Sequence, residues 1–256
     1  MPSIFLNHGG GPMPLLGQQP DVAEFCSSYA ASLPGKPTAI VVVTAHWEEQ
    51  VTTVCSAGSP SLYFDYYGFP PESYQYTYPA PGSPELAEHI QSLLREAGLA
   101  VTADSQRGWD HGVFVPLMLM FPDADVPVVA VSVLANQDAG QHIAVGEALC
   151  SLRDQGVLLI GSGYEFHNFK YLKPILFSGG DERLRKQGIQ HSHDFDSFLR
   201  QTITGAAAYA SRKEVLTQWE QTPAASEAQP PGGAEHLMPL FAMFGAGGQD
   251  GKAKVR

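Results

Sequence analysis

Four short runs of apolar, largely β-branched residues constrain the fold more than any other feature of this sequence. They cover Ser3–Leu6, Ala39–Thr44, Val126–Val133 and Val157–Ile160. Each run is continuous rather than alternating, which is the pattern of strands that are buried on both faces of a parallel sheet. We therefore expect four buried, mainly parallel strands.

Segments with helical spacing separate these runs. They are Asp21–Ser32, Pro84–Ala97, Gly140–Gln155 and Ser192–Thr204. The alternation of strands and helices predicts an α/β fold, a single-domain layered sheet with largely parallel central strands flanked by helices. A chain of 256 residues lies within the size range of one such domain.

Three further segments have no clear periodicity. Ser59–Gly82 is rich in tyrosine, phenylalanine and proline and should form an ordered aromatic loop, and Gln221–Gly233 reads as a connector before Ala234–Phe244. The glycine-rich end of the chain resembles a frayed terminus. We expect one domain over residues 1–244 and a flexible C-terminal tail over residues 245–256.

Charge and composition exclude several classes of protein. The formal net charge is −11 and no basic stripe interrupts it, so nucleic acid is a poor partner. No segment approaches the roughly 20 apolar residues of a membrane span, and the N-terminus lacks the basic region of a signal peptide. The unpaired spacing of Cys26, Cys55 and Cys150 fits buried free thiols in a reducing compartment. We expect a soluble cytoplasmic protein.

Histidines follow three of the four predicted strands. His8 lies two residues after the first run, His46 two residues after the second, and His167 seven residues after the last. Ligands of open α/β sheets gather beyond the carboxyl ends of the strands. Three imidazoles at one edge would suit a divalent metal ion, since histidine is a common ligand of zinc and iron.

The residues after His8 support this interpretation. Gly9-Gly10-Gly11 lets the backbone approach closely, and Pro12 stiffens the exit from the turn. A plain tight turn and a phosphate-binding loop are the alternatives. A phosphate loop is disfavoured because no Lys-Ser or Lys-Thr pair follows the glycines, so we favour a metal-site loop.

Two other histidines are candidates for the same site. His236 lies just after the connector and would supply a further imidazole, while Glu235 beside it offers a carboxylate. Either side chain would close the site. His111 is held between glycines beside Asp110, which would orient its ring and raise its basicity. We expect His111 to act as an acid/base or substrate contact.

The remaining histidines have simpler explanations. His89 and His142 are expected on the surfaces of helices, and His191 and His193 at a polar helix start. A single histidine is more often structural or solvent-exposed than a ligand. We therefore leave these four out of the site.

Taken together, the sequence resembles the class III extradiol ring-cleavage dioxygenases, in the branch that includes DOPA 4,5-dioxygenase-like proteins. The similarity spans nearly the whole chain. The motifs that carry it are HGGGP (His8–Pro12), TAHWE (Thr44–Glu48), YGFP (Tyr67–Pro70), YPAPGSPEL (Tyr78–Leu86), DHGVFVPL (Asp110–Leu117), GSG…HN (Gly161–Asn168) and EHLMPLF (Glu235–Phe241).

The resemblance implies one divalent metal ion, Fe(II) for turnover or Zn(II) as found. It implies that His8, His46 and His236 ligate the metal, and that His167 is either a further ligand or the catalytic base. An all-histidine set departs from the usual two-histidine, one-carboxylate iron triad.

The resemblance also implies a small aromatic diol and dioxygen as substrates. His111 matches the substrate-side histidine of the family, with Asp110 beside it. Tyr67 and Phe69 are expected to wall the ring pocket, although packing within the aromatic loop explains such residues equally well.

Two alternatives to a dioxygenase stay open from the sequence. One is a zinc-dependent hydrolase in which Glu48 or Glu235 activates water, although no H-E-x-x-H motif supports it. The other is a catalytically silent metal-binding or signalling protein, because the same fold occurs in a non-catalytic branch related to Memo.

Overall fold

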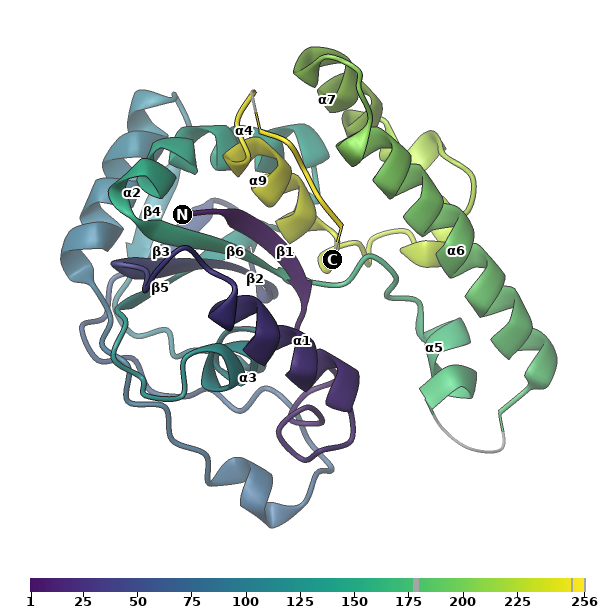
Figure 1. Cartoon of the computed structure of the whole chain (residues 1–256), viewed down its shortest axis with the longest axis horizontal. Helices are drawn as coiled ribbons and strands as arrows, with labels where there is room; N and C mark the ends of the chain where they lie inside the picture. Colours follow the sequence, from purple (N-terminus) through teal and green to yellow (C-terminus); the bar gives the residue numbers. More distant parts are fainter. Residues whose placement is uncertain (177–179, 250, 256) are drawn as a thin grey trace.

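A six-stranded sheet lies at the centre of the computed structural model, which describes residues 1–176, 180–249 and 251–255 (Figure 1). The strand order is β1-β6-β2-β5-β3-β4. The strands are β1 (Ser3–Asn7), β2 (Ala39–Glu49), β3 (Thr52–Cys55), β4 (Val101–Asp104), β5 (Val128–Leu134) and β6 (Val157–Gly163).

The four predicted strands are confirmed, and they form the contiguous parallel block β1-β6-β2-β5. β3 and β4 were not predicted. β3 pairs antiparallel to β5 and parallel to β4. The sequence of β4, VTAD, has no buried residue, so neither an apolar run nor a regular alternation marks it.

Helices cover both faces of the sheet. They are α1 (Pro20–Ala31), α2 (Pro84–Glu96), α3 (His111–Met120), α4 (Ala139–Leu149), α5 (Phe169–Leu176), α6 (Glu182–Thr204), α7 (Tyr209–Thr217), α8 (Ala225–Ala228) and α9 (Met238–Ala246). Short 3-10 helices are η1 (Pro71–Tyr74), η2 (Cys150–Gln155) and η3 (Trp219–Gln221). Figure 1 shows α1 and α3 on one side of the sheet, α2, α4 and α9 on the other, and α5 to α7 projecting beyond it.

The continuous apolar runs are explained by burial on both sides. Within β2, Val41 and Val43 belong to the core under α4 and α9, whereas Ile40 and Val42 belong to the core under α1 and α3. All four are at most 1% exposed. A strand that is covered on both faces has no polar side, which is why its sequence does not alternate.

Two predicted helices match α1 and α2 closely, and the third, Gly140–Gln155, is α4 up to Leu149 followed by the 3-10 helix η2. The fourth prediction, for α6, does not match. α6 begins at Glu182 rather than Ser192, because Asp181 caps it by accepting hydrogen bonds from the Arg183 and Leu184 amides. His191 and His193 therefore lie within the helix, and their expected place at a helix start was wrong.

The expectation that His142 is a surface residue was also wrong. Its side chain is 2% exposed. Nε2 accepts a hydrogen bond from the Leu134 amide at 2.9 Å, and Nδ1 donates to the Asp138 carbonyl at 2.7 Å. Both ring nitrogens are satisfied by backbone, so His142 is a structural histidine that ties β5 to α4. His89 is exposed, as expected.

Two boundary predictions need correction. The segment Gln221–Gly233 is more than a connector, because it contains α8 and buries Ala228 and Gln229. α9 continues to Ala246, so ordered, buried structure extends past residue 244. Residues 250 and 256 of the expected tail lie outside the described residues. No helix in the described part of the chain is long and apolar enough to cross a membrane.

Candidate metal centre

The register of the parallel block brings the first two histidines together. Leu6 of β1 and Thr44 of β2 both pair with Ser162 of β6, and a histidine follows two residues later in each case, His8 just beyond the end of β1 and His46 within β2. The pairing of β2 with β5 shifts between Thr44 and Glu48. His46 lies inside this irregularity, and bulges of this kind redirect a side chain.

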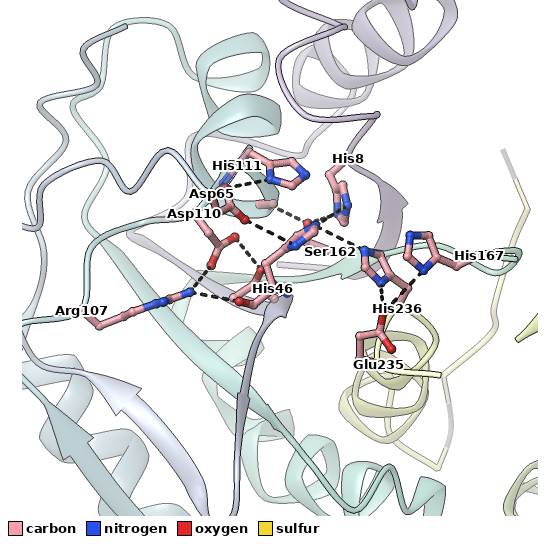
Figure 2. Close-up of polar contacts among 12 residues, drawn as sticks. His8, His46, Asp65, Arg107, Asp110, His111, Ser162, His167, Glu235 and His236 are labelled. Atoms are coloured by element: carbon pink, nitrogen blue, oxygen red, sulfur yellow. Dashed lines mark hydrogen bonds and ion pairs between the residues drawn. The ribbon is translucent and has the colours of Figure 1, made fainter. Parts of the chain in front are cut away.

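His236 joins these two residues from the segment that leads into α9. The Nε2 atoms of His8 and His46 are 3.1 Å apart, and those of His46 and His236 are 3.3 Å apart (Figure 2). Positive backbone angles at Gly9 (φ 84°) and Gly11 (φ 60°) form the turn after His8, a conformation that favours glycine. The structure thus brings His8, His46 and His236 into one cluster.

The hydrogen bonds of Ser162 determine which nitrogen of the His8 ring carries the proton. The Ser162 hydroxyl donates its single proton to the Gly112 carbonyl, so its oxygen accepts from His8 Nδ1, 2.9 Å away. The proton of a neutral His8 ring therefore lies on Nδ1. Its Nε2 carries a lone pair that faces His46.

The Nδ1 atoms of His236 and His46 also face an acceptor. His236 Nδ1 donates to Glu235 Oε1 at 2.8 Å, and His46 Nδ1 lies 3.4 Å from Asp65 Oδ2. The hydrogen bond to Glu235 places the His236 proton on Nδ1, and the nearby Asp65 carboxylate favours the same tautomer of His46 electrostatically, which leaves Nε2 of each ring as the electron-pair donor. Partners of this kind on the second ring nitrogen fix the tautomer and orientation of metal-binding histidines.

The electrostatics keep these imidazoles neutral. Burial, together with the neighbouring imidazoles, lowers the pKa of His8 and of His46 well below the ordinary value. Burial also lowers the pKa of His236 to about 4, against the opposing effect of Glu235. Burial alone would raise the pKa of Glu235, but hydrogen bonds from His167 and His236 hold it well below its usual range.

With its proton on Nδ1, each of these neutral rings has no proton on Nε2, so neither the His8–His46 nor the His46–His236 contact can be a hydrogen bond. A cation that accepts their lone pairs resolves this arrangement, and nitrogen donors of this type suit zinc or ferrous iron. Potential ligand atoms form two adjoining groups, one of His8, His46 and His111, the other of His167, Glu235 and His236. The His46–His236 contact joins the two groups, so the candidate ligand atoms form one continuous cluster.

His167 and His111 flank this cluster. The ring of His167 stacks on that of His236 with centroids 3.5 Å apart, and its Nδ1 lies 3.5 Å from Glu235 Oε1. No hydrogen bond or ring contact joins His167 to His8 or His46 among the described residues. His111 packs against His46 at 3.9 Å between centroids and donates from Nδ1 to Asp65 Oδ1 at 2.8 Å.

Asp110 lies behind the cluster rather than within it. Its side chain is 1% exposed. One oxygen accepts from the Thr44 hydroxyl at 2.8 Å, and the other from Arg107 Nη2 at 3.2 Å. Arg107 Nη2 also donates to the His46 carbonyl at 3.1 Å (Figure 2). Asp110 thereby braces, through Arg107, the backbone of β2 at His46.

The two aromatic candidates differ in position. Tyr67 is 90% exposed. Phe69 is partly buried and packs edge-on against Tyr66 at 5.5 Å between centroids. A Cβ on Gly11 would lie 3.2 Å from the Phe69 ring, so Phe69, unlike Tyr67, contacts the turn that carries His8.

Several residues of the site were missed by sequence reasoning. They are Asp65, Ser162 and Tyr164. The Tyr164 ring lies 5.0 Å from that of His8 and 5.8 Å from that of His236. Ser162 and Tyr164 follow a predicted strand, so their position at its carboxyl end was an available signal. Asp65 had no such signal, because it lies in the irregular aromatic loop.

Comparisons with known proteins agree with this geometry. The family model described as "Catalytic LigB subunit of aromatic ring-opening dioxygenase" matches residues 1–256. The chain is 38% identical to Dioxygenase tasH of Hapsidospora irregularis, over 99% of this chain and 80% of that protein. It is 37% identical to 4,5-DOPA dioxygenase extradiol of Beta vulgaris, over 99% and 89% of the two chains.

A solved structure has the same fold. The crystal structure of an uncharacterized protein from Escherichia coli K12 superposes with a TM-score of 0.72 at 29% sequence identity, covering 96% of this chain and 88% of that one. The family match spans every residue that contributes to the histidine cluster. The chain therefore belongs to the family of the catalytic LigB subunit of aromatic ring-opening dioxygenases.

Proposed function

We propose that this protein is a metal-dependent extradiol dioxygenase that opens the ring of a catechol such as DOPA with dioxygen. The observation that carries the proposal is the convergence of three Nε2 lone pairs, from His8, His46 and His236. Two further imidazoles, His111 and His167, lie beside them. The family match and the names of the relatives agree with this chemistry.

The metal we propose for turnover is ferrous iron, with zinc as an ion that the same ligands accept. When bound, the iron activates dioxygen and increases the acidity of the catechol hydroxyls. Glu235 is not proposed as a ligand, because its Oε1 already accepts from His236 and faces His167 Nδ1.

His167 is proposed as the catalytic base. Its Nδ1 faces Glu235, whose lowered pKa keeps it ionised, so the proton of a neutral ring belongs on Nδ1. Its Nε2 makes no hydrogen bond within the described residues and is left as a proton acceptor. A catechol hydroxyl within hydrogen-bond reach would transfer its proton to this atom, which is the role of a general base.

His111 is proposed to hold the substrate side of the site. Asp65 fixes its Nδ1 proton, which leaves Nε2 free in the part of the chain that the structure describes. Phe69, and Tyr67 at the exposed rim, are proposed to line the approach of the aromatic ring. Asp110 is proposed to act through Arg107 and the backbone of His46 rather than by touching substrate.

The structure gives no support to a hydrolase. Glu48 is exposed and accepts a hydrogen bond from Gln137, while Glu235 is engaged by two imidazoles. We therefore propose neither carboxylate as the activator of a metal-bound water. We further propose a cytoplasmic location, because Cys26, Cys55 and Cys150 are unpaired and such thiols persist under reducing conditions.

Oxygen consumption tests the proposed function. The protein is reconstituted anaerobically with Fe(II), mixed with DOPA or another catechol, and exposed to air while oxygen uptake and a yellow ring-opened product are followed. We expect uptake that depends on both iron and catechol. Absence of uptake with every catechol tried, by protein shown to hold iron, would contradict the proposal and favour a catalytically silent relative.

A further inference from the structure

One carboxylate in the aromatic loop contacts two different histidines of the site. Asp65 Oδ1 accepts from His111 Nδ1 at 2.8 Å and from the His111 amide at 3.0 Å. Asp65 Oδ2 lies 3.4 Å from His46 Nδ1. Figure 2 shows Asp65 between the two rings.

The loop holds Asp65 firmly in this place. The Tyr63 amide donates to the Trp109 carbonyl at 2.7 Å, and the Trp109 amide donates to the Ser61 carbonyl at 2.9 Å. These bonds lay the loop alongside the segment that leads into His111. The next residue, Tyr66, is buried, and its ring lies 6.0 Å from that of His111. The loop thus presents the carboxylate at a fixed position.

We propose that Asp65 is a positioning residue that serves two histidines at once, fixing the tautomer of the metal ligand His46 and the orientation of His111. The inference rests on the proposed function and extends it. It assigns a purpose to the aromatic loop that substrate contact alone does not give. Partners of metal-ligating histidines typically change metal affinity by about 10- to 100-fold when they are removed.

The two oxygens of Asp65 contact different histidines, so an isosteric substitution of Asp65 tests the proposal. In Asp65→Asn, the amide oxygen keeps both hydrogen bonds from His111. The amide nitrogen then takes the place of Oδ2 and donates toward His46 Nδ1. That reversal favours the His46 tautomer with its proton on Nε2, which removes the lone pair that the metal needs.

The experiment is a titration of metal-free, full-length protein with Zn(II) in competition with a chromophoric chelator. The variants are Asp65→Asn, His111→Gln and the double variant, with Glu72→Gln as the control for an exposed acidic side chain in the same loop. We expect Asp65→Asn to weaken zinc binding by about tenfold or more. Glu72→Gln should leave zinc affinity unchanged, His111→Gln should weaken zinc binding less than Asp65→Asn does, and the double variant should bind zinc no more tightly than Asp65→Asn.

Asp65→Glu is the control for a folding defect. It changes the side chain at the same position but keeps an anionic acceptor in the loop. It should recover part of the zinc affinity that Asp65→Asn loses, an effect that general damage to the loop would not produce. Unchanged zinc affinity in Asp65→Asn, or equal losses in the Asn and Glu variants, would overturn the proposal.

Turnover at saturating Fe(II) tests the second half of the proposal. Asp65→Asn keeps the His111 contacts, so we expect its turnover number to recover at saturating iron, whereas His111→Gln stays slow. A turnover number for Asp65→Asn that stays as low as that of His111→Gln would contradict the division between the oxygens. Failure of the wild-type protein to turn over any catechol would refute the proposed function, and the zinc titration would still decide the role of Asp65.

Discussion

The rings of His167 and His236 stack with centroids 3.5 Å apart and 22° between their planes, and Nδ1 of each faces the same Glu235 oxygen. Of these two histidines, only His236 makes a close contact with His46 within the described residues, with their Nε2 atoms 3.3 Å apart. The two histidines are thus held by one carboxylate but are placed for different tasks. We propose that His236 binds the metal and that His167 moves a proton.

Replacement of His167 separates these tasks. His167→Ala should retain metal, because His8, His46 and His236 remain, but should lower the turnover number by about 100-fold or more, which is the usual contribution of a general base. His46→Ala should lose the metal. Metal content by atomic absorption and oxygen uptake check both. Loss of metal in His167→Ala would make His167 a ligand and refute its role as the base.

Removal of the Ser162 hydroxyl should weaken metal binding through His8. Ser162→Ala leaves His8 Nδ1 without its acceptor and the buried Gly112 carbonyl without its donor. We expect about tenfold weaker zinc binding and a loss of about 1–3 kcal/mol in the free energy of unfolding.

Ser132→Ala is the matched control. Ser132 is also buried and accepts from the Thr53 amide, but it does not contact a site histidine in the described structure. It should lower stability and leave zinc affinity unchanged. A comparable loss of zinc affinity in both variants would show that the effect of Ser162→Ala is general destabilisation.

Gly163 is expected to be intolerant of any side chain. A Cβ at this position would lie 2.1 Å from the His236 carbonyl oxygen, so Gly163→Ala must displace the segment that carries His236. We expect weaker metal binding and a loss of roughly 1–3 kcal/mol in stability. Gly35→Ala is the control, since nothing lies within 4 Å of its Cβ. Normal zinc affinity in Gly163→Ala would contradict the close approach.

The free energy of unfolding should decrease as the pH is lowered, because His142 is buried in its neutral form. Its ring nitrogens contact only backbone atoms and no histidine of the candidate site in the described structure. Burial lowers the pKa of His142 from 6.5 to about 4 in the folded protein. Between these values the unfolded chain binds more protons, so stability is full above pH 6.5 and falls as the pH drops toward 4. The loss is about 3 kcal/mol.

Denaturant unfolding of metal-free protein across this pH range measures the effect. His142→Gln should flatten the pH dependence by that amount, and His89→Gln, at an exposed position, should leave the slope unchanged. Equal slopes for wild type and His142→Gln would show that His142 does not titrate as the structure indicates.

The sequence was most informative where burial dictates composition. Continuous apolar runs predicted β1, β2, β5 and β6, and the residues after them predicted His8 and His46 at one edge. α3 was missed because it is apolar on all sides and contains Pro116, so it shows neither an amphipathic stripe nor an uninterrupted helical pattern.

Partners of the histidines were harder to predict, because their contacts depend on tertiary structure. Asp65 is 46 residues from His111 and Ser162 is 154 residues from His8. No local periodicity encodes such pairs. Asp65 lies in the irregular aromatic loop, where no periodicity predicts the direction of a side chain. The motifs that carry the family resemblance do not include it.

The most direct test of the proposed dioxygenase activity is to follow both atoms of dioxygen into the product. Iron-loaded protein is supplied with a catechol and isotopically labelled dioxygen, and the ring-opened product is analysed by mass spectrometry with correction for exchange of aldehyde oxygen with water. For a dioxygenase, we predict that both atoms of one labelled dioxygen molecule enter the product. A product that takes its oxygen from water, or an intact catechol oxidised without incorporation, would contradict it.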